Sequence, residues 1–143
     1  GNAAVASLDD ASAARAAAIG AKVGALIDVQ PVGDGRLAFD SDAFDMVVID
    51  DTRGTFGAIP DTSRMSILRE ARRVVRPSGR IEVVEGVGGG GLLRTAITRP
   101  PGYDSTRDLE AAGFRPVRAL AERDGYRFVE GLRPNDSKPI API

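Results

Sequence analysis

The stretch that decides the fold is Ala43-Phe44-Asp45-Met46-Val47-Val48-Ile49-Asp50-Asp51. Residues 44–49 are apolar apart from Asp45, and such an uninterrupted run is typical of a strand in a parallel sheet that is covered on both faces. Two adjacent acids end the run. Ligands of open α/β sheets bind beyond the C-terminal ends of the strands, so Asp50 and Asp51 are the first candidates for functional residues.

The chain upstream of this run has the pattern of a strand, a helix and a second strand. A run of small apolar residues predicts a buried strand over residues 3–8. An alanine-rich helix follows, which we expect Asp10 or Ser12 to cap and Gly24 to close. Two further segments complete this half, a strand over residues 25–30 and a loop over residues 31–42.

Downstream of the run, a loop over residues 52–60 leads into a helix that Asp61 or Thr62 caps and that runs to about Val75. Its apolar positions share one face and its arginines fall largely outside that face, so we expect the arginines to be solvated. The shared face comprises Met65, Leu68, Ala71, Arg72 and Val75, and the arginines outside it are Arg64, Arg69, Arg73 and Arg76.

A proline and glycine turn at residues 76–79 joins that helix directly to a strand over residues 80–85. Residues 86–103 are rich in glycine and proline and are expected to form a long loop. The glycine run over residues 86–91 lacks the lysine of a phosphate-binding P-loop, so we interpret it as a flexible connection.

The C-terminal part predicts a short helix and a hairpin. The helix has Ser105 as its expected N-cap and Gly113 as its expected C-cap. The pair Asp124-Gly125 stands between two alternating segments, which is a strong hairpin signal. The segments are residues 117–122 and 126–132, and a flexible tail is expected over residues 134–143.

This alternation predicts an α/β fold with a doubly wound, Rossmann-like, mostly parallel sheet that ends in an antiparallel hairpin. We expect one domain over residues 1–133. Because the C-terminal ends of parallel strands meet at one edge, the acids that follow the strands should converge there. These acids are Asp9, Asp10, Asp28, Asp50, Asp51 and Glu85.

The amino-acid composition limits the reactions and binding sites that the chain can support. The chain of 143 residues has no cysteine and no histidine, which excludes disulfides, zinc sites built on those residues and imidazole acid/base catalysis. We expect no metal. A formal charge of −1 removes the electrostatic argument for binding nucleic acid or an anionic membrane, so a small-molecule partner is expected. The first residues have no signal-peptide pattern and arginine outnumbers lysine, from which we expect a cytoplasmic bacterial protein.

Two segments resemble class I S-adenosylmethionine-dependent methyltransferases of the methyltransferase type 11-like kind. Gly33-Asp34-Gly35-Arg36-Leu37-Ala38-Phe39-Asp40-Ser41-Asp42-Ala43-Phe44-Asp45-Met46-Val47-Val48 resembles the pattern "GDA..LPF....FD.V". Leu68-Arg69-Glu70-Ala71-Arg72-Arg73-Val74-Val75-Arg76-Pro77-Ser78-Gly79-Arg80 resembles "L.E..RVLKPGG". The resemblance extends over residues 3–133, and its specific part covers residues 33–84.

The resemblance implies S-adenosylmethionine as the cofactor. It implies that Asp9 or Asp10 binds the ribose, because a carboxylate accepts hydrogen bonds from two neighbouring hydroxyls. It also implies that Asp34 and Gly35 lie beside the adenine, and that Asp50 and Asp51 face the methyl group and the acceptor. The alternative interpretation is a helix cap for Asp10 and a Gly-Asp-Gly turn for Asp34.

One departure from the family is serious. The family has a glycine-rich turn after its first strand, and nothing before Asp9 contains such a turn, so that strand is expected to be missing from the middle of the sheet. Its loss leaves backbone hydrogen-bonding groups exposed on both neighbouring strands. Three outcomes are open: the chain is a fragment, which we favour; another chain fills the place; or the strand at Ala3 pairs directly with the strand at Phe44.

The sequence therefore predicts methyl transfer to a small-molecule acceptor, in which Asp50 or Asp51 accepts a proton from the acceptor. The rival hypothesis is a non-catalytic, degenerate methyltransferase-like fold that serves as a dimerisation or interaction module, for example as a homodimer. A nicotinamide-binding Rossmann enzyme is disfavoured because its G-x-G-x-x-G turn is absent as well.

Overall fold

The computed structural model describes residues 3–24, 27–32, 34–87 and 102–136. Most of the long glycine-rich loop and of the expected tail lies outside the described residues. The described elements are β1 (Ala3–Ser7), α1 (Asp10–Val23), β2 (Ile27–Pro31), β3 (Phe44–Asp51), α2 (Thr55–Ala58), α3 (Asp61–Val74), β4 (Val75–Gly86), α4 (Ser105–Ala111), β5 (Val117–Arg123) and β6 (Tyr126–Leu132).

The strands form two separate hydrogen-bonded sheets instead of the single sheet that the sequence predicted. β1 and β2 pair in parallel, and a second sheet has the order β3-β4-β6-β5. In the second sheet β3 and β4 are parallel, whereas β6 pairs antiparallel with both β4 and β5. The predicted α/β class, with parallel strands followed by an antiparallel hairpin, is confirmed. Of the three outcomes that the sequence left open, direct pairing of the strand at Ala3 with the strand at Phe44 does not occur among the described residues.

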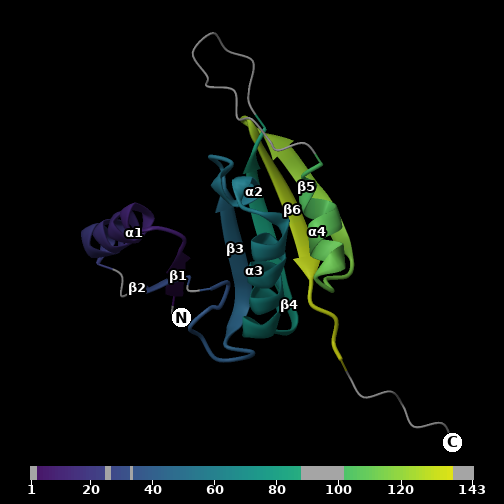
Figure 1. The fold of residues 1–143 in the computed structure, drawn as a ribbon, viewed down its shortest axis with the longest axis horizontal. Helices are drawn as coiled ribbons and strands as arrows, with labels where there is room; N and C mark the ends of the chain where they lie inside the picture. The colour runs from purple at the N-terminus through teal and green to yellow at the C-terminus, as the bar shows by residue number, and fades with distance from the viewer. Residues whose placement is uncertain (1–2, 25–26, 33, 88–101, 137–143) are drawn as a thin grey trace, which may run out of the picture.

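The hydrophobic core lies between the four-stranded sheet and the helices α3 and α4, which cover the same face of that sheet (Figure 1). The residues of this core come from α2 and α3, from β4, from α4 and the segment after it, and from β6. Its fully buried side chains include Leu68, Ile81, Val83, Leu109, Phe114 and Val129. Gly79 lets β4 approach β3, because a Cβ there would lie only 2.8 Å from the carbonyl oxygen of Asp45.

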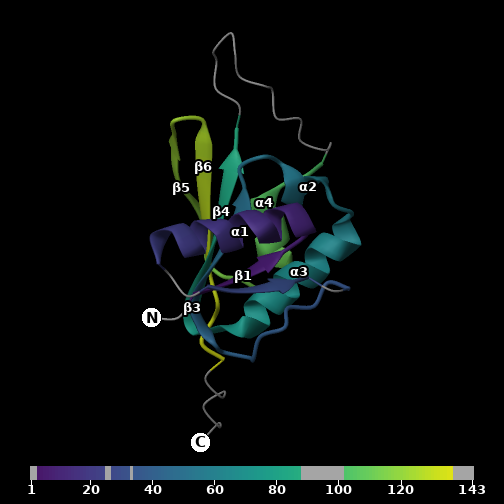
Figure 2. The ribbon, with the colours of Figure 1, turned by 90° about the vertical axis from the view of Figure 1, so that its left-hand side faces the viewer.

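The opposite face of β3 is open, contrary to the expectation of a strand covered on both faces. Val47 and Ile49 pack against the core, whereas Met46 is 36% and Val48 is 55% exposed. The strand β1 is also only partly buried, because Ala3 and Ala6 are exposed and only Ser7 is fully buried. The reason is tertiary: α1, β1 and β2 form a unit of their own on the β3 side of the larger sheet (Figures 1 and 2).

Several helix ends differ from the prediction by one residue. Asp9, and not Asp10 or Ser12, caps α1, and its carboxylate accepts a hydrogen bond from the backbone N–H of Ser12 at 2.6 Å. Asp104, and not Ser105, caps α4. An N-cap side chain accepts hydrogen bonds from the first free N–H groups of the helix. Because two adjacent residues at each of these helix starts have a side-chain oxygen, the sequence alone did not show which of the two is the cap.

The turns have positive φ at residues that tolerate it, which are glycine and aspartate. Gly24 closes α1 with a φ of 69°, as predicted. Ala112, and not Gly113, is the C-cap of α4, and Gly113 follows it with a φ of 97°. Asp124 and Gly125 both have positive φ, which is the geometry of a tight hairpin turn. The short helix α2 was not predicted, because the sequence around it reads as a loop. None of the described helices is long and apolar enough to cross a membrane.

Candidate functional site

Two buried carboxylates lie side by side where β3 and β4 end. Asp51 and Glu85 are partners in the parallel register, and they are only 3% and 1% exposed. The carboxylate of Asp51 accepts hydrogen bonds from the backbone N–H groups of Phe56 at 2.8 Å and Gly57 at 3.1 Å. The last acid of β3 thus fixes the start of α2, and the pair marks the C-terminal edge of the parallel strands.

Asp50 points to the other side of the strand and is exposed. Its carboxylate accepts hydrogen bonds from the backbone N–H of Thr52 at 3.0 Å and from the Thr52 hydroxyl at 2.7 Å. This is a local turn of the kind that aspartate favours. Alternation along a strand therefore separates the two adjacent acids, and only Asp51 meets Glu85.

Tyr103 joins the carboxylate pair from the segment before α4. Its hydroxyl oxygen is completely buried and has no hydrogen-bond partner among the described residues. Burial, followed by the charges of Asp51 and Glu85, raises the pKa of the Tyr103 hydroxyl, which therefore stays protonated. Gly57 makes room for this arrangement, because a Cβ there would lie 3.0 Å from the ring and 3.2 Å from Asp51 Oδ2.

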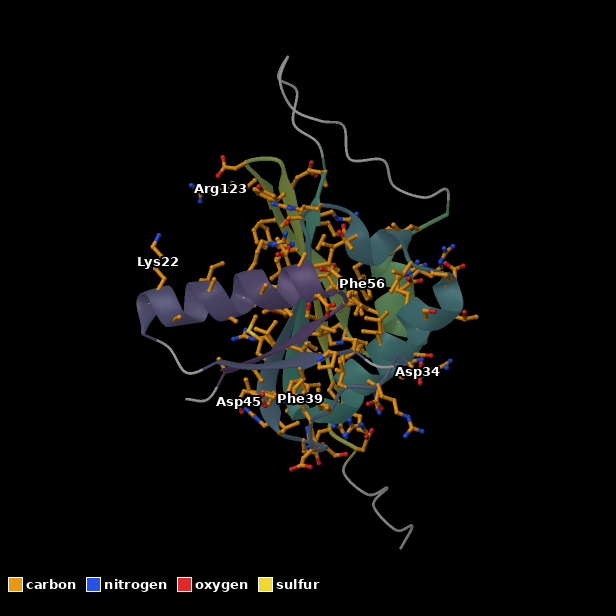
Figure 3. All side chains as sticks on the ribbon, turned by 60° about the vertical axis from the view of Figure 1, so that its left-hand side comes forward. Lys22, Asp34, Phe39, Asp45, Phe56 and Arg123 are labelled. Atoms are coloured by element: carbon orange, nitrogen blue, oxygen red, sulfur yellow. The ribbon has the colours of Figure 1, made fainter. Side chains whose placement is uncertain are left out.

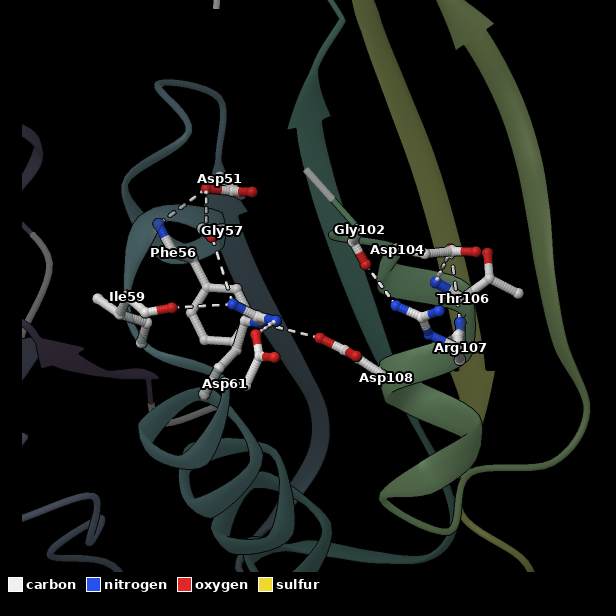
Figure 4. A network of polar contacts seen from close by, with 11 residues as sticks. Asp51, Phe56, Gly57, Ile59, Asp61, Gly102, Asp104, Thr106, Arg107 and Asp108 are labelled. Atoms are coloured by element: carbon white, nitrogen blue, oxygen red, sulfur yellow. Dashed lines mark hydrogen bonds and ion pairs between the residues drawn. The ribbon is translucent and has the colours of Figure 1, made fainter. Parts of the chain in front are cut away.

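Arg64 connects the elements around this site, and Figure 4 shows three of its partners, Ile59, Asp61 and Asp108, on neighbouring elements. Its guanidinium donates to Asp108 Oδ2 at 2.7 Å, to Asp61 Oδ1 at 2.5 Å and to the carbonyl oxygen of Ile59 at 2.9 Å. Its Cζ atom lies 4.7 Å from the centre of the Tyr103 ring, a cation–π distance. One side chain thus connects α2, α3, α4 and the tyrosine beside the carboxylate pair.

The expectation that Arg64 belongs to a solvated helix face was wrong, because its side chain is only 4% exposed. Burial lowers the pKa of the guanidinium, but the hydrogen bonds to Asp108 and Asp61 outweigh that effect and raise the pKa overall. The sequence held a signal for this burial. Arg64 stands four residues before Leu68 and seven before Ala71, which places it on the buried face of α3.

The first two acids of the chain lie at the other sheet. Asp9 and Asp10 line a hollow of about 200 Å³ together with Ser7, Leu8, Ala13, Pro31 and Val32, where β1 and β2 end. Asp9 is engaged by Ser12, whose backbone N–H and hydroxyl donate to its two oxygens at 2.6 and 3.1 Å. These bonds lower the pKa of the Asp9 carboxyl. Asp10 lies in the first turn of α1 and is exposed.

Asp34 and Gly35 form a tight turn beside α3. Both have positive φ, 49° and 75°, and a Cβ on Gly35 would lie 2.8 Å from Ser66 Cβ in α3. Asp34 is exposed at the surface, on the side of the molecule away from Lys22 (Figure 3). The roles predicted for Asp34 and Gly35 at an adenine remain predictions.

Not all of the expected strand-end acids converge. Asp28 is the second residue of β2 instead of its end, and its carboxylate accepts a hydrogen bond from the Gln30 side chain at 2.7 Å. Asp9 and Asp10 follow β1 of the two-stranded sheet, at the start of α1, whereas Asp51 and Glu85 lie in β3 and β4 of the four-stranded sheet. Within the described part of the chain, no group of three or more His, Cys, Asp or Glu side chains is arranged to hold a metal ion.

Comparisons with known proteins concern the fold. No protein-family model matches the chain. No curated protein matches it. A SAM-dependent methyltransferase from Aquifex aeolicus has a TM-score of 0.71 at 16% identity, over 92% of this chain and 69% of that one. PigF, in a structure with SAH, has a TM-score of 0.61 at 19% identity, over 92% of this chain and 43% of PigF.

A third similar structure is the [4+2]-cyclase SpnF, with a TM-score of 0.67 at 16% identity, over 93% of this chain. The chain spans 66% of the length of SpnF. Together these similarities show that the chain has a class I S-adenosylmethionine-dependent methyltransferase-like fold. Because a cyclase shares it, the fold leaves the reaction to be argued from the site.

Proposed function

We propose that the chain is part of an enzyme that transfers a methyl group from S-adenosylmethionine to a small-molecule acceptor. The observation that carries the proposal is the buried pair Asp51 and Glu85 at the C-terminal edge of the parallel strands, which is where open α/β sheets bind ligands. The fold likeness to methyltransferases supports it. S-adenosylmethionine supplies an activated methyl group, so the protein has to position donor and acceptor.

The cofactor fits the described residues in part. The hollow where β1 and β2 end has Asp10 in its lining, and a carboxylate accepts hydrogen bonds from the hydroxyls of a ribose. Among the described residues, no glycine-rich turn follows β1 that would offer N–H groups to the rest of the cofactor. The described part of the chain thus supports the ribose end of the site, and Asp34 with Gly35 remains the proposed adenine side.

Of the two acids that the sequence left open, we assign the ribose to Asp10. Both oxygens of Asp9 already accept hydrogen bonds from Ser12, and those bonds cap α1. A carboxylate that binds two vicinal hydroxyls needs both of its oxygens. Asp10 lines the same hollow and is exposed, so its carboxylate is accessible to a ligand.

Calorimetric titration with S-adenosylhomocysteine tests the proposal. We expect binding in the micromolar range, about −8 kcal/mol, by the full-length gene product. Asp10→Asn should weaken that binding about tenfold and leave the thermal midpoint unchanged. Asp9→Ala is the matched control, because it should lower the thermal midpoint through the lost cap and change the affinity little. Absence of both heat and thermal shift in the wild type would overturn the proposal.

An interaction module is the second candidate function, and the divided sheet favours it. Among the described residues, no strand pairs with the edge of β3 that is not bonded to β4, and none bridges β1 to β3. An unpaired edge is a template for another strand. Under this hypothesis the chain associates through β3 without using a cofactor, and light scattering distinguishes it from a monomer that binds S-adenosylhomocysteine.

A further inference from the structure

The described residues up to Val32, which we call the N-terminal unit, make their hydrogen bonds among themselves. β1 pairs with β2 along its whole length, and the Val32 backbone N–H donates to the Ser7 carbonyl oxygen at 2.8 Å. Every side-chain hydrogen bond of this unit within the described part of the chain also ends inside it. Its own contacts therefore hold the N-terminal unit together.

The apolar packing is divided in the same way. The described hydrophobic core and the side chains packed against it come from residues 47–129. In α1 only Gly20 is buried, whereas Ile19 and Val23 are 60% and 68% exposed. Figures 1 and 2 show α1, β1 and β2 together beside β3, apart from the helices that cover the larger sheet. Bodies of one chain that share no large apolar interface are expected to move relative to each other.

The boundary of the N-terminal unit is sharp. Gly35 lies so close to α3 that a Cβ there would be 2.8 Å from Ser66 Cβ. Leu37 is bonded to the same helix through both its backbone N–H and its carbonyl oxygen. The other described residues, from Asp34 onward, thus form a second body, which we call the main body, and the chain passes from one body to the other between Val32 and Asp34.

The residues proposed for the cofactor fall on both bodies. Asp10, which we assign to the ribose, lines the hollow of the N-terminal unit. Asp34 and Gly35, which we propose for the adenine side, belong to the main body. A ligand that contacts two bodies favours the orientation in which both sets of contacts form, and it thereby reduces their relative motion.

We propose that the N-terminal unit moves as one body relative to the main body, and that S-adenosylmethionine fixes their relative orientation when it binds across them. The first half of this inference stands on the packing alone. The second half rests on the proposed function, and it adds closure of two bodies around the cofactor to that function.

Distances between pairs of spin labels, measured by pulsed electron paramagnetic resonance, test the motion. The chain of 143 residues has no cysteine, so labels attach only at introduced cysteines. Lys22→Cys with Arg69→Cys spans the two bodies. Ala6→Cys with Lys22→Cys lies within the N-terminal unit, Arg69→Cys with Glu110→Cys lies within the main body, and all four positions are exposed. Without ligand, we expect the distance distribution across the bodies to be about twofold wider than either internal distribution.

Saturating S-adenosylhomocysteine should narrow the distribution across the bodies to about the width of the internal ones. In the Asp10→Asn variant, the same narrowing should need about tenfold more ligand. Asp28→Asn is the matched control, because Asp28 is an exposed acid of the same unit that does not line the hollow. It should leave the required ligand concentration unchanged.

Two results without ligand overturn the inference. One is a distribution across the bodies that is as narrow as the internal ones. The other is a wide distribution within the N-terminal unit, which would show that the unit unfolds instead of moving as one body. If Lys22→Cys does not fold, Ala18→Cys at an exposed position of the same helix replaces it in both pairs.

The ligand half and the proposed function fail in different ways. Binding of S-adenosylhomocysteine in calorimetry, with no change in the width of the distribution across the bodies, overturns the ligand half and leaves the proposed function standing. If neither this chain nor the full-length gene product binds S-adenosylhomocysteine, the proposed function and the ligand half fail together, and the unbound distributions still decide the motion.

Discussion

At the scale of single residues, the best-defined feature is a buried arginine and not one of the acids that mark the strand ends. Arg64 donates to carboxylates on α3 and α4 and to two carbonyl oxygens at and just after the end of α2. A buried charge is tolerated when its hydrogen bonds are made, and removing one partner leaves the others uncompensated. Arg64 therefore holds α2, and with it the N–H groups that bind Asp51.

We predict that Arg64→Met lowers the free energy of unfolding by about 3–5 kcal/mol, because Asp108 loses its buried cation and two carbonyl oxygens lose their donor. Urea denaturation followed by circular dichroism measures the change. Arg69→Met is the control, since Arg69 is exposed on the same helix and should change the free energy by less than about 0.5 kcal/mol. Equal effects of the two substitutions would show that the buried network contributes little.

At the scale of elements, the connection between β2 and β3 is bound to α3 by the ion pair of Glu70 and Arg73, which we call the Glu70 tie. Glu70 accepts a hydrogen bond from the Leu37 backbone N–H at 3.1 Å, and Arg73 donates to Glu70 at 2.8 Å and to the Leu37 carbonyl oxygen at 3.0 Å. The hydrogen bond from Arg73 is the main reason that the pKa of the Glu70 carboxyl is lowered. The ionised carboxylate is thus the form that secures the connection.

This tie predicts a dependence of stability on pH. Since folding lowers the pKa of Glu70 below 4.5, its contribution is fully present above that pH and is lost as the pH falls through the lower, folded value. Glu70→Gln should lose about 0.5–1 kcal/mol at pH 7, and the difference from the wild type should shrink below pH 4.5. Urea midpoints between pH 3 and pH 7 measure it. Glu110→Gln, an exposed residue of α4, should show no such pH dependence.

At the scale of the whole molecule, the divided sheet is the main departure from a regular doubly wound domain. The exposed face of β3 carries Met46 and Val48 beside an edge to which no described strand is bonded. Apolar side chains next to an unpaired edge favour association with a further strand. The acids that follow β1 and the acids that end β3 and β4 therefore lie at the ends of different sheets.

We predict that the chain of 143 residues self-associates at concentrations near 100 μM and that Val48→Lys suppresses this association, because a charge on the open face opposes strand addition. Light scattering over a dilution series measures it. Leu120→Lys, at an exposed apolar position on β5, should leave the association unchanged. A chain that is monomeric at every concentration would contradict the prediction and the interaction-module hypothesis together.

Local patterns determined the elements of this protein. The apolar run of β3, the alanine-rich α1 and the Asp124-Gly125 turn are recognisable because neighbouring residues alone set their periodicity and backbone geometry. The acids at strand ends were also recognisable, since strands and their ends can be read from the same patterns.

Only the tertiary structure decided which of those acids meet and what surrounds them. Asp51 meets Glu85 because β3 and β4 pair in one register, and Asp50 is turned away by the alternation of the same strand. Tyr103 approaches that pair from a segment far away in the sequence. Its ring packs against the guanidinium of the buried Arg64, whose hydrogen-bond partners lie on three helices and their connections. Contacts between residues far apart in the chain depend on packing, and among the described residues packing brings no strand to the edge of β3 that is not bonded to β4.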